Sequence, residues 1–435
     1  MVDSHVAGTN GFAGRPRVLG DHQSALSRCI AIPTGKFAER YWAAAPLLTP
    51  AAMLDLGFDD LFSPTAVDEL ISERGLRTPF LRMAKNGSVL ASSTFTRSGG
   101  TGATIADQVA DDKVLAQLAG GASLVLQALH RTWPPLIRFG SDLAAELGHP
   151  VQINAYITPP ENQGFAAHYD THDVFVLQVA GSKRWTIHSP VIEDPLPSQT
   201  WEQRTAQVAA RATERPLIDT VLQPGDALYL PRGYLHSAVA QGEVSILLTV
   251  GVHSLTAYDL ATELIAAAAT DRELRRSLPL GLDVTDLDGI TEHVRAAAKR
   301  LAAAVDGADQ AHLATVARTV GRRQAGETRP APLAPLAQLA ALRALTADTP
   351  LRIRQGLRPI LRDAGERVLL NVMDSTISWP AQVGESLQYV LHSAFFRPFD
   401  LPALDPDEQL VVARRLLREG VVVPAVVDQK SAQGD

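Results

Sequence analysis

The sequence has little cysteine and little lysine. Cys29 is the only cysteine among the 435 residues, so the chain can form no intrachain disulfide and no cysteine-based zinc or iron–sulfur site. A chain without disulfides is typical of a reducing compartment, and we expect a cytoplasmic protein. Lysine occurs six times against 34 arginines, so a lysine inside an apolar segment stands out.

Long apolar runs and an excess of positive charge are also missing. No stretch reaches the roughly 18 apolar residues that a membrane span needs, and the start of the chain has neither the basic nor the apolar part of a secretory signal. The net charge of −7 argues against a protein that coats nucleic acid. We therefore expect no membrane partner and no direct nucleic-acid binding, although Arg211, Arg215 and Arg232 leave room for a local basic patch.

The residue types of a metal site are present. His168 and Asp170 form an H-x-D tripeptide, and His236 follows later in the chain. Two imidazoles and one carboxylate on one face of the metal, with the other positions open, are typical of mononuclear non-haem Fe(II) sites. Residues i and i+2 of a strand point the same way, roughly 6.6 Å apart. The pattern therefore predicts a metal held by His168, Asp170 and His236.

The segments around these residues favour short antiparallel strands. Residues 173–179 and 183–188 are rich in β-branched and aromatic residues, and Gly181 and Ser182 between them predict a turn. His236 follows short apolar runs that are interrupted by Pro-Gly pairs. A small antiparallel barrel would bring this late strand back beside the early one.

Other histidines compete for the site. The tripeptide alone also occurs by chance at exposed positions. His172, at i+4 from His168, would share its face if the strand ran straight, but three ligands on one strand would crowd the metal from a single line. His188 and His253 also lie in strand-like runs, and we interpret them as structural or as neighbours of the ligands.

These motifs, in this order and spacing, resemble the JmjC-type ribosomal oxygenases, a branch of the cupin superfamily of 2-oxoglutarate oxygenases. The similarity covers roughly residues 30–255. It is carried by NAYITPP (154–160), HYDTHDVFVLQ (168–178), GSKRW (181–185), LQPGD (222–226) and LPRGYLHS (230–237).

The resemblance implies a site that holds Fe(II), 2-oxoglutarate and O2. Lys183 matches the family's basic residue for the distal carboxylate of 2-oxoglutarate, and a compact ammonium suits a single carboxylate. The alternative is a lysine that protects an edge strand from aggregation. Tyr156 matches a tyrosine that binds the same carboxylate, Thr249 matches a position that lines the pocket, and Asn154 is a candidate neighbour of the ligands. Gly251 departs from the pattern, because the family often has serine there.

The resemblance also implies the architecture. We expect an α+β protein with a JmjC/cupin double-stranded β-helix, or jelly-roll, barrel, a helical dimerisation region and a C-terminal winged-helix domain. The expected boundaries are a flexible tail over 1–25, a catalytic domain over 26–257, a helical region with linker over 258–335 and a winged-helix-like domain over 336–435.

Several elements can be predicted directly. Helical spacing runs over 114–133 and 136–147, and over 261–269, 272–278 and 290–305. The glycine-rich stretch 98–102 predicts a loop, and the polar stretch 190–216 predicts a connection near the mouth of the barrel. Residues 322–335, charged and rich in proline, predict a linker. Asp405 predicts a helix start and Gly420 a helix end.

The function expected from the resemblance is hydroxylation of a side chain, Arg or His, in a ribosomal protein by a homodimeric enzyme. Two alternatives within the class are a peptide natural product and a free amino acid as substrate. A non-oxidative cupin that uses Zn or Mn in the same ligands, and a metal-free binding protein, are alternatives from other classes. Lys183 separates the first of these from the oxygenases, because a hydrolase has no need to anchor a distal carboxylate.

Overall fold

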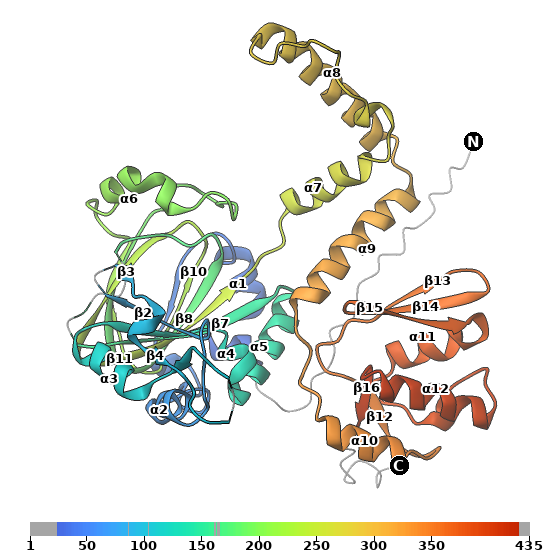
Figure 1. Cartoon of the computed structure of the whole chain (residues 1–435), viewed down its shortest axis with the longest axis horizontal. Coiled ribbons are helices and arrows are strands. Elements are labelled where there is room, and N and C mark those ends of the chain that lie inside the picture. Colours follow the sequence, from blue (N-terminus) through green and yellow to red (C-terminus); the bar gives the residue numbers. More distant parts are fainter. Residues whose placement is uncertain (1–23, 86, 103, 161, 163–165, 426–435) are drawn as a thin grey trace, which may run out of the picture.

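The computed structural model describes residues 24–85, 87–102, 104–160, 162 and 166–425. It consists of a barrel body, a helical arm that projects from it and a second body formed by the C-terminal part of the chain (Figure 1). No helix of the described part has both the length and the apolar character that a bilayer crossing requires. The flexible tail predicted over 1–25 lies almost wholly outside the described residues.

The barrel body is built on one antiparallel sheet of nine strands. Its order is β1-β10-β8-β11-β7-β6-β2-β3, with β9 paired to β8. The strands are β1 (Leu47–Thr49), β2 (Leu81–Lys85), β3 (Ser88–Val89), β6 (Ser123–Leu126), β7 (Val151–Thr158), β8 (Asp173–His188), β9 (Ile218–Leu222), β10 (Ala227–Leu230) and β11 (Leu235–Val252).

The long strands β8 and β11 give the sheet two layers. The first half of β8 pairs with β10 and its second half pairs with β9, while β11 follows β8 along both halves. The pairing between β8 and β11 shifts its register between Gln241 and Ile246. Two long strands that serve both layers of an antiparallel sheet are consistent with a jelly-roll barrel.

The turn predicted at Gly181 and Ser182 is wrong, because β8 continues through both residues. Gly181 instead marks a bend, with φ at +60°. A Cβ atom at this position would collide with the carbonyl oxygen of Val244 on β11. The glycine therefore marks a close approach of two strands inside the sheet.

Helices and a small hairpin precede β7 and surround the barrel (Figure 1). Predicted helix 136–147 is confirmed as α5, which begins at Pro134. The prediction over 114–133 is wrong in its middle, because the buried strand β6 follows the first helix. The elements are α1 (Thr34–Arg40), α2 (Pro64–Ser72), β4 (Thr96–Arg97), β5 (Gln108–Val109), α3 (Asp111–Ala119), α4 (Leu129–Thr132) and α5 (Pro134–Leu147). Residues 98–102 form a loop, as predicted.

The helical arm consists of α7 (Ala257–Ala268), α8 (Leu287–Asp306) and α9 (Gln310–Glu327). No residue of α7 or α8 is buried, whereas α9 buries Val316 and Val320. Of the predicted segment 272–278 only a 3-10 turn, Glu273–Arg275, is helical. The predicted linker begins too early, since α9 continues to Glu327 and α10 (Pro335–Arg343) follows after a short extended segment.

The C-terminal body has an apolar core of its own. Three strands form one antiparallel sheet and two more form a short ribbon. The elements are β12 (Leu351–Ile353), β13 (Ile360–Asp363), β14 (Arg367–Val372), β15 (Ser375–Pro380), α11 (Gly384–His392), α12 (Pro406–Arg418) and β16 (Val422–Pro424). Asp405 caps α12 through the backbone N–H groups of Asp407 and Glu408, as predicted, and Gly420 lies just beyond the helix with φ at +67°.

Candidate metal centre

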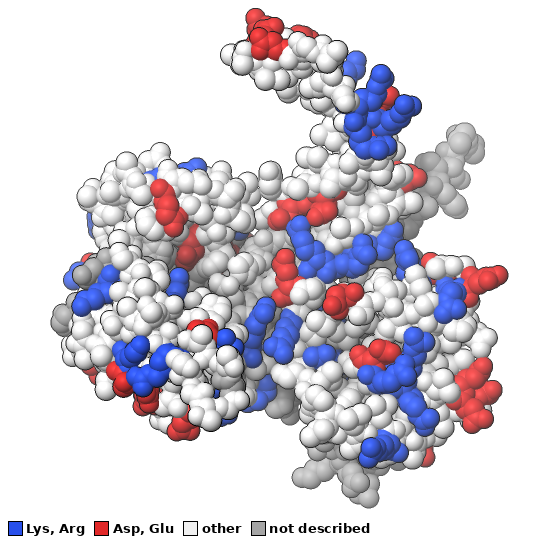
Figure 2. Space-filling model, viewed as in Figure 1, with Lys and Arg blue, Asp and Glu red and all other residues white. Residues whose placement is uncertain are grey.

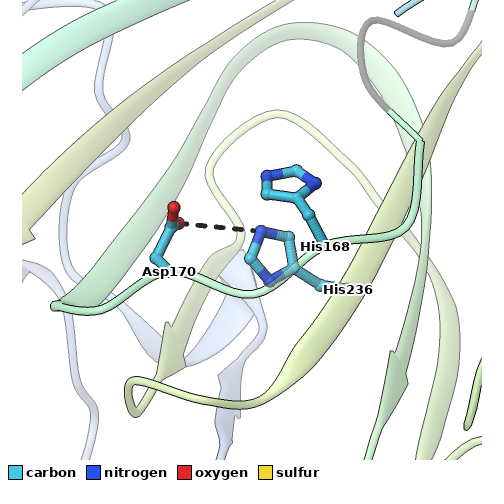
Figure 3. Close-up of side chains that lie close together, drawn as sticks. All are labelled: His168, Asp170 and His236. Atoms are coloured by element: carbon cyan, nitrogen blue, oxygen red, sulfur yellow. Dashed lines mark ion pairs between the residues drawn. The ribbon is translucent and has the colours of Figure 1, made fainter. Parts of the chain in front are cut away.

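Three side chains predicted as metal ligands meet at one end of the barrel. One ligand atom from each of His168, Asp170 and His236 lies within 4.8 Å of the others. Nε2 of His236 and Oδ2 of Asp170 are 3.8 Å apart, and both imidazoles face the carboxylate (Figure 3). Within the described residues this is the one such group of three or more histidine, cysteine or acidic side chains.

The backbone around His168 is strand-like even though β8 begins only at Asp173. His168 and His236 exchange two backbone hydrogen bonds, of 3.0 and 2.8 Å, as an isolated antiparallel bridge. Tyr169, between the two ligands, points the other way and is buried, with its hydroxyl donating to the carbonyl of Gln199 at 2.8 Å. The alternation of a strand therefore directs both His168 and Asp170 into the barrel.

The approach to His236 is fixed by a buried carboxylate. Asp173 is fully buried and accepts a hydrogen bond from the backbone N–H of Arg232 at 2.9 Å and one from the hydroxyl of Tyr229 at 3.0 Å. The backbone N–H of Gly233 donates to the carbonyl of Asp170 at 2.9 Å. These bonds connect the turn before β11 to the segment that carries the other two ligands.

Both histidines have the tautomer that a metal requires. Nδ1 of His168 lies 2.7 Å from the carbonyl of Ala166, and Nδ1 of His236 lies 3.0 Å from the carbonyl of Tyr234. A carbonyl can only accept, so each Nδ1 carries the proton and Nε2 is the atom of each ring that can bind a metal. Burial lowers the pKa of His236 to about 4, with His168 acting in the same direction, so this ring is neutral at pH 7.

The carboxylate is ionised. Burial alone would raise the pKa of Asp170, but the nearby rings of His236, His172 and His168, together with Arg82, hold it below its usual range. Two imidazoles and one anionic carboxylate fit a divalent cation of the Fe(II) type.

A cavity of about 620 Å³, including its open mouth, extends from these ligands into the barrel. Its walls are mostly apolar, and Lys183 reaches it from the second half of β8. Lys183 is 5% exposed, and its ammonium donates to the hydroxyl of Thr158 at 3.1 Å. Burial lowers the pKa of this lysine to about 8. A buried, positively charged group with one hydrogen bond is suited to an anionic partner.

Two of the other predicted cosubstrate residues line the same cavity and one does not. Tyr156 and Thr249 are in its wall. Burial raises the pKa of Tyr156, and Asp170 adds to this effect. Asn154 is not in the lining, and its side-chain oxygen accepts a hydrogen bond from the backbone N–H of Ala128 at 3.0 Å. Its role in the structure is therefore to hold the turn before α4.

The competing histidines lie outside the group of ligands. His172 turns away from the cavity and packs against His253, with ring centroids 5.2 Å apart. A Cβ atom at Gly251 would lie 3.1 Å from the ring of His172. The missing serine and the extra histidine are therefore one feature, because His172 occupies the space beside Gly251. His188 is buried at the end of β8 and does not line the cavity.

Three neighbours of the ligands were not predicted. Arg82 on β2 is in register with Val125 and, across β6, with Tyr156, which it hydrogen-bonds. Trp185 lies 5.8 Å from His236 between ring centroids, and Trp201 lies 6.3 Å from His168. Alternation along β8 could have placed Trp185 on the face of Lys183. No local signal indicates Arg82, because its place depends on pairing between distant strands.

The connection predicted over 190–216 contains a short 3-10 helix, Trp201–Arg204, and α6 (Thr205–Arg211). It packs over the segment that carries the first two ligands, with Val208, Tyr169 and Leu235 forming a small buried cluster. The predicted local basic patch is neutralised in part, since Arg211 pairs with Glu214 and Arg232 with Asp194.

The chain has recognisable relatives. Residues 137–260 match the model of the JmjC domain. A bifunctional lysine-specific demethylase and histidyl-hydroxylase NO66 from Drosophila persimilis is 37% identical over 139 residues, which are 30% of this chain and 19% of that protein. Ribosomal oxygenase 1 from Rattus norvegicus is 34% identical over 166 residues, 37% of this chain and 27% of that one. The chain thus spans well under a third of either relative.

A solved structure of similar extent is that of YcfD, a ribosomal oxygenase from Escherichia coli in complex with cobalt and 2-oxoglutarate. It is 17% identical, the similarity covers 90% of this chain and 98% of that one, and the TM-score is 0.48. The match of residues 137–260 includes all three candidate ligands, Lys183 and both long strands of the barrel. These residues form a JmjC domain, as the motifs indicated.

Proposed function

We propose that this protein is a 2-oxoglutarate- and Fe(II)-dependent oxygenase that hydroxylates an amino-acid side chain of a protein. The observation that carries the proposal is a single cavity with two chemically different ends. One end has two imidazoles and a carboxylate with donor atoms within 4.8 Å of one another. The other end has the buried ammonium of Lys183.

In this proposal His168, Asp170 and His236 bind Fe(II) through Nε2, a carboxylate oxygen and Nε2. The bound metal, with 2-oxoglutarate and O2, supplies the oxidation that hydroxylates a C–H bond while 2-oxoglutarate leaves as succinate and CO2. The carboxylate of Asp170 balances part of the metal charge, and the backbone carbonyls on each Nδ1 fix the ring orientations. The chain then needs no nucleophile and no acid–base pair.

The residues at the other end bind the cosubstrate. Lys183 forms an ion pair with the distal carboxylate. Thr158, which accepts a hydrogen bond from Lys183, and Tyr156 in the cavity wall place hydroxyl groups beside this ion pair. Val174, Leu247 and the remaining apolar wall exclude water, which strengthens the ion pair. The same lysine weighs against the non-oxidative Zn or Mn alternative, since hydrolysis by metal-bound water needs no carboxylate anchor at this depth.

We propose a ribosomal protein as substrate, with Arg or His as the modified residue. The names of the NO66 and ribosomal oxygenase relatives support this choice. A groove of about 1310 Å³ runs beside the ligand segment, from Thr171 and His172 to α7 and α9. A groove of this size has room for several residues of a polypeptide. A peptide natural product is the alternative, and a free amino acid would leave most of the groove unused.

We propose that the arm forms a homodimer with a second copy of the chain. The chain itself buries no residue of α8, so the apolar face of this helix lacks the tertiary packing that gives most helices in proteins their stability. Its apolar side chains are exposed, among them Leu287 at 76% and Val294 at 61%. Light scattering should give twice the chain mass, and Leu287→Glu combined with Val294→Glu should give the monomer while the barrel stays folded.

We keep the expected domains 1–25, 26–257, 258–335 and 336–435 as a proposal, and with them a winged-helix-like fold for the last and a cytoplasmic location. The separate apolar cores of the barrel and of the C-terminal body support the division. Several regular elements of the last segment, two helices and five short strands among them, are compatible with a winged helix.

The function is tested by anaerobic addition of Fe(II) and 2-oxoglutarate. We expect a weak visible absorption band of the chelate, and succinate after air is admitted. If the absorption band and succinate were both absent, the oxygenase proposal would be contradicted. Mass spectrometry of ribosomal proteins from matched wild-type and deletion cells should then find one residue with an added oxygen atom. Unmodified ribosomes in both strains, with succinate still formed in vitro, would refute only the substrate.

A further inference from the structure

The barrel body and the C-terminal body meet along a seam that hydrogen bonds hold together. The backbone N–H of Ala331 donates to the carbonyl of Gln355 at 2.8 Å, and Nε of Arg354 donates to the carbonyl of Ala331 at 2.5 Å. The amide of Gln355 reaches Asp142 on α5. Three separate parts of the chain are therefore fixed against each other: α5, the segment after α9 and the loop between β12 and β13.

Four arginines from α4, from the segment after α9 and from the loop between β12 and β13 gather at the seam. We call them the seam arginines: Arg131, Arg329, Arg354 and Arg358. Arg131, Arg329 and Arg358 are exposed and Arg354 is half-buried. None of the four forms an ion pair with a carboxylate of the described residues. What sets these four apart is that they come together at one junction, whereas the paired arginines of the described residues lie beside a carboxylate.

Groups around the seam respond to this uncompensated charge. Burial lowers the pKa of His130 to about 4, and both Arg131 and Arg329 add to the effect. Burial also lowers the pKa of Arg354, and Arg329 lowers it further. The pKa of His149 is lowered by burial and, to a smaller extent, by Arg358. Titratable groups on three elements thus sense the same excess of positive charge.

A cavity at the seam offers hydrogen-bond donors. His130, Arg131, Ser141, Thr328 and Arg329 are in its lining, and its volume is about 410 Å³ including the open mouth. Nδ1 of His130 accepts from the backbone N–H of Ile153 at 3.0 Å, so Nε2 of this neutral ring carries a proton and is a donor. Glu327 is the one carboxylate in the lining. Such a set favours an oxyanion such as phosphate.

The positive charge extends beyond this cavity. Residues 318–367 contain ten arginines against four acidic residues, in a chain whose net charge is −7. Figure 2 shows blue side chains along α9 and again beside α4 and α5, on both sides of the junction between the two bodies. Arg318 and Arg322 lie on α9, and neither forms an ion pair within the described residues, unlike Arg323 on the same helix. The basic surface is therefore a strip and not a single pocket.

We propose that this strip binds the phosphate backbone of nucleic acid, RNA in the first place. A strip of guanidinium groups matches a ligand that carries one negative charge per nucleotide along its length, and guanidinium groups bind phosphate oxygens in pairs. A single anion would occupy only the cavity at His130 and leave the rest of the strip unpaired. The net charge of −7 led us to expect no direct nucleic-acid binding. Net charge sums over the whole chain, so it does not reveal a basic strip on an otherwise acidic protein.

The test is binding of a short labelled single-stranded RNA to the full chain, measured by fluorescence anisotropy. Four phosphate contacts predict that affinity falls about 50-fold between about 50 and about 200 mM salt. The triple variant Arg131→Gln, Arg329→Gln, Arg358→Gln should reduce affinity at low salt about tenfold or more and flatten the salt dependence by about two to three contacts.

The matched control is Arg40→Gln, Arg215→Gln, Arg414→Gln, which removes the same charge from exposed positions away from the seam. Its RNA affinity should stay within about twofold of wild type, because distant exposed charges are screened. All six arginines are exposed, so both variants should fold, which circular dichroism checks.

Four results would overturn the proposal. The first is no RNA binding at low salt, and the second is an equal loss in the seam and control variants. The third is displacement of RNA by inorganic phosphate at matched ionic strength, which would identify a site for a single anion. Displacement by polyglutamate at equal charge concentration would likewise assign the strip to an acidic polypeptide and not to nucleic acid.

Discussion

The two ends of the barrel cavity differ in how their side chains are held before a ligand binds. At the metal end the backbone orients both histidine ligands: two Nδ1–H groups donate to carbonyls, and the segment of His168 is bridged to that of His236. At the other end Lys183 is buried with one side-chain hydrogen bond. The metal end is preorganised before anything binds, whereas the lysine end carries a desolvated charge that only an anion relieves.

Removing a ligand should have the largest effect. His236→Ala leaves two donors on one short segment, and we expect Co(II) or Fe(II) affinity to fall by more than about 100-fold, since loss of an outer partner alone costs up to about that. Isothermal titration measures it. His253→Ala is the matched control, because His253 lies outside the cavity lining. Full metal occupancy in His236→Ala would make His172 the third ligand.

Removing the lysine should lower the affinity for 2-oxoglutarate and raise the stability of the ligand-free protein. Lys183→Met should weaken 2-oxoglutarate binding about 30-fold or more while sparing the metal, as for loss of a buried charge partner. Without ligand, the variant should also be more stable than wild type at pH 7, by on the order of a few kcal/mol.

The sign follows from the pKa of Lys183, which burial lowers from 10.5 to about 8. Below pH 8 the unfolded chain and the folded chain both carry the proton, and the folded chain carries it at a cost. As pH rises from about 8 towards 10.5 the folded chain releases the proton first, so the cost disappears and the advantage of the variant shrinks. Thermal melts from pH 7 to 10 without ligand measure this. A less stable variant at pH 7 would mean that Lys183 has a stabilising partner in the ligand-free protein.

Tyr156→Phe should have a smaller effect, confined to the lysine end. One hydrogen bond to the cosubstrate is lost, which costs about 1 kcal/mol or roughly fivefold in 2-oxoglutarate affinity. Tyr234→Phe is the control, because the hydroxyl of Tyr234 donates to the carbonyl of Ala44 away from the cavity lining. An equal change in metal affinity would show that the two ends are not independent.

The smallest effect is expected at Gly251. Gly251→Ser brings a Cβ atom to 3.1 Å from the ring of His172, so the ring must move by a few tenths of an ångström. We expect a loss of stability of roughly 1 kcal/mol, which His172→Ala in the same chain should relieve. Thermal melts measure the stability of the single variants and of the double variant. If the two losses of stability were additive in the double variant, the coupling of these two positions would be contradicted.

The same contrast explains what the sequence can predict. His168, Asp170 and the strands after Asp173 follow from alternation and from local composition, and the family resemblance indicates Lys183. Arg82 reaches the site only through pairing across β6, and no local pattern encodes that. The strand β6 escapes prediction because its apolar run also fits a helix, and Gly181 looks like a turn because glycine serves both turns and close strand contacts. The basic strip escapes prediction because its arginines come from three parts of the chain.

The pairing of β8 with β11 has a consequence for length. His236 lies opposite Ile187 and Lys183 lies opposite Ala240, so the ladder counts four residues between the two positions, or roughly 13 Å of strand. The bend at Gly181 lies outside this interval, and nothing within it can stretch. The pairing of the two strands therefore fixes the distance between the metal end and the lysine end of the cavity. Inserting one residue would add about 3.3 Å and turn Lys183 to the outer face of the barrel.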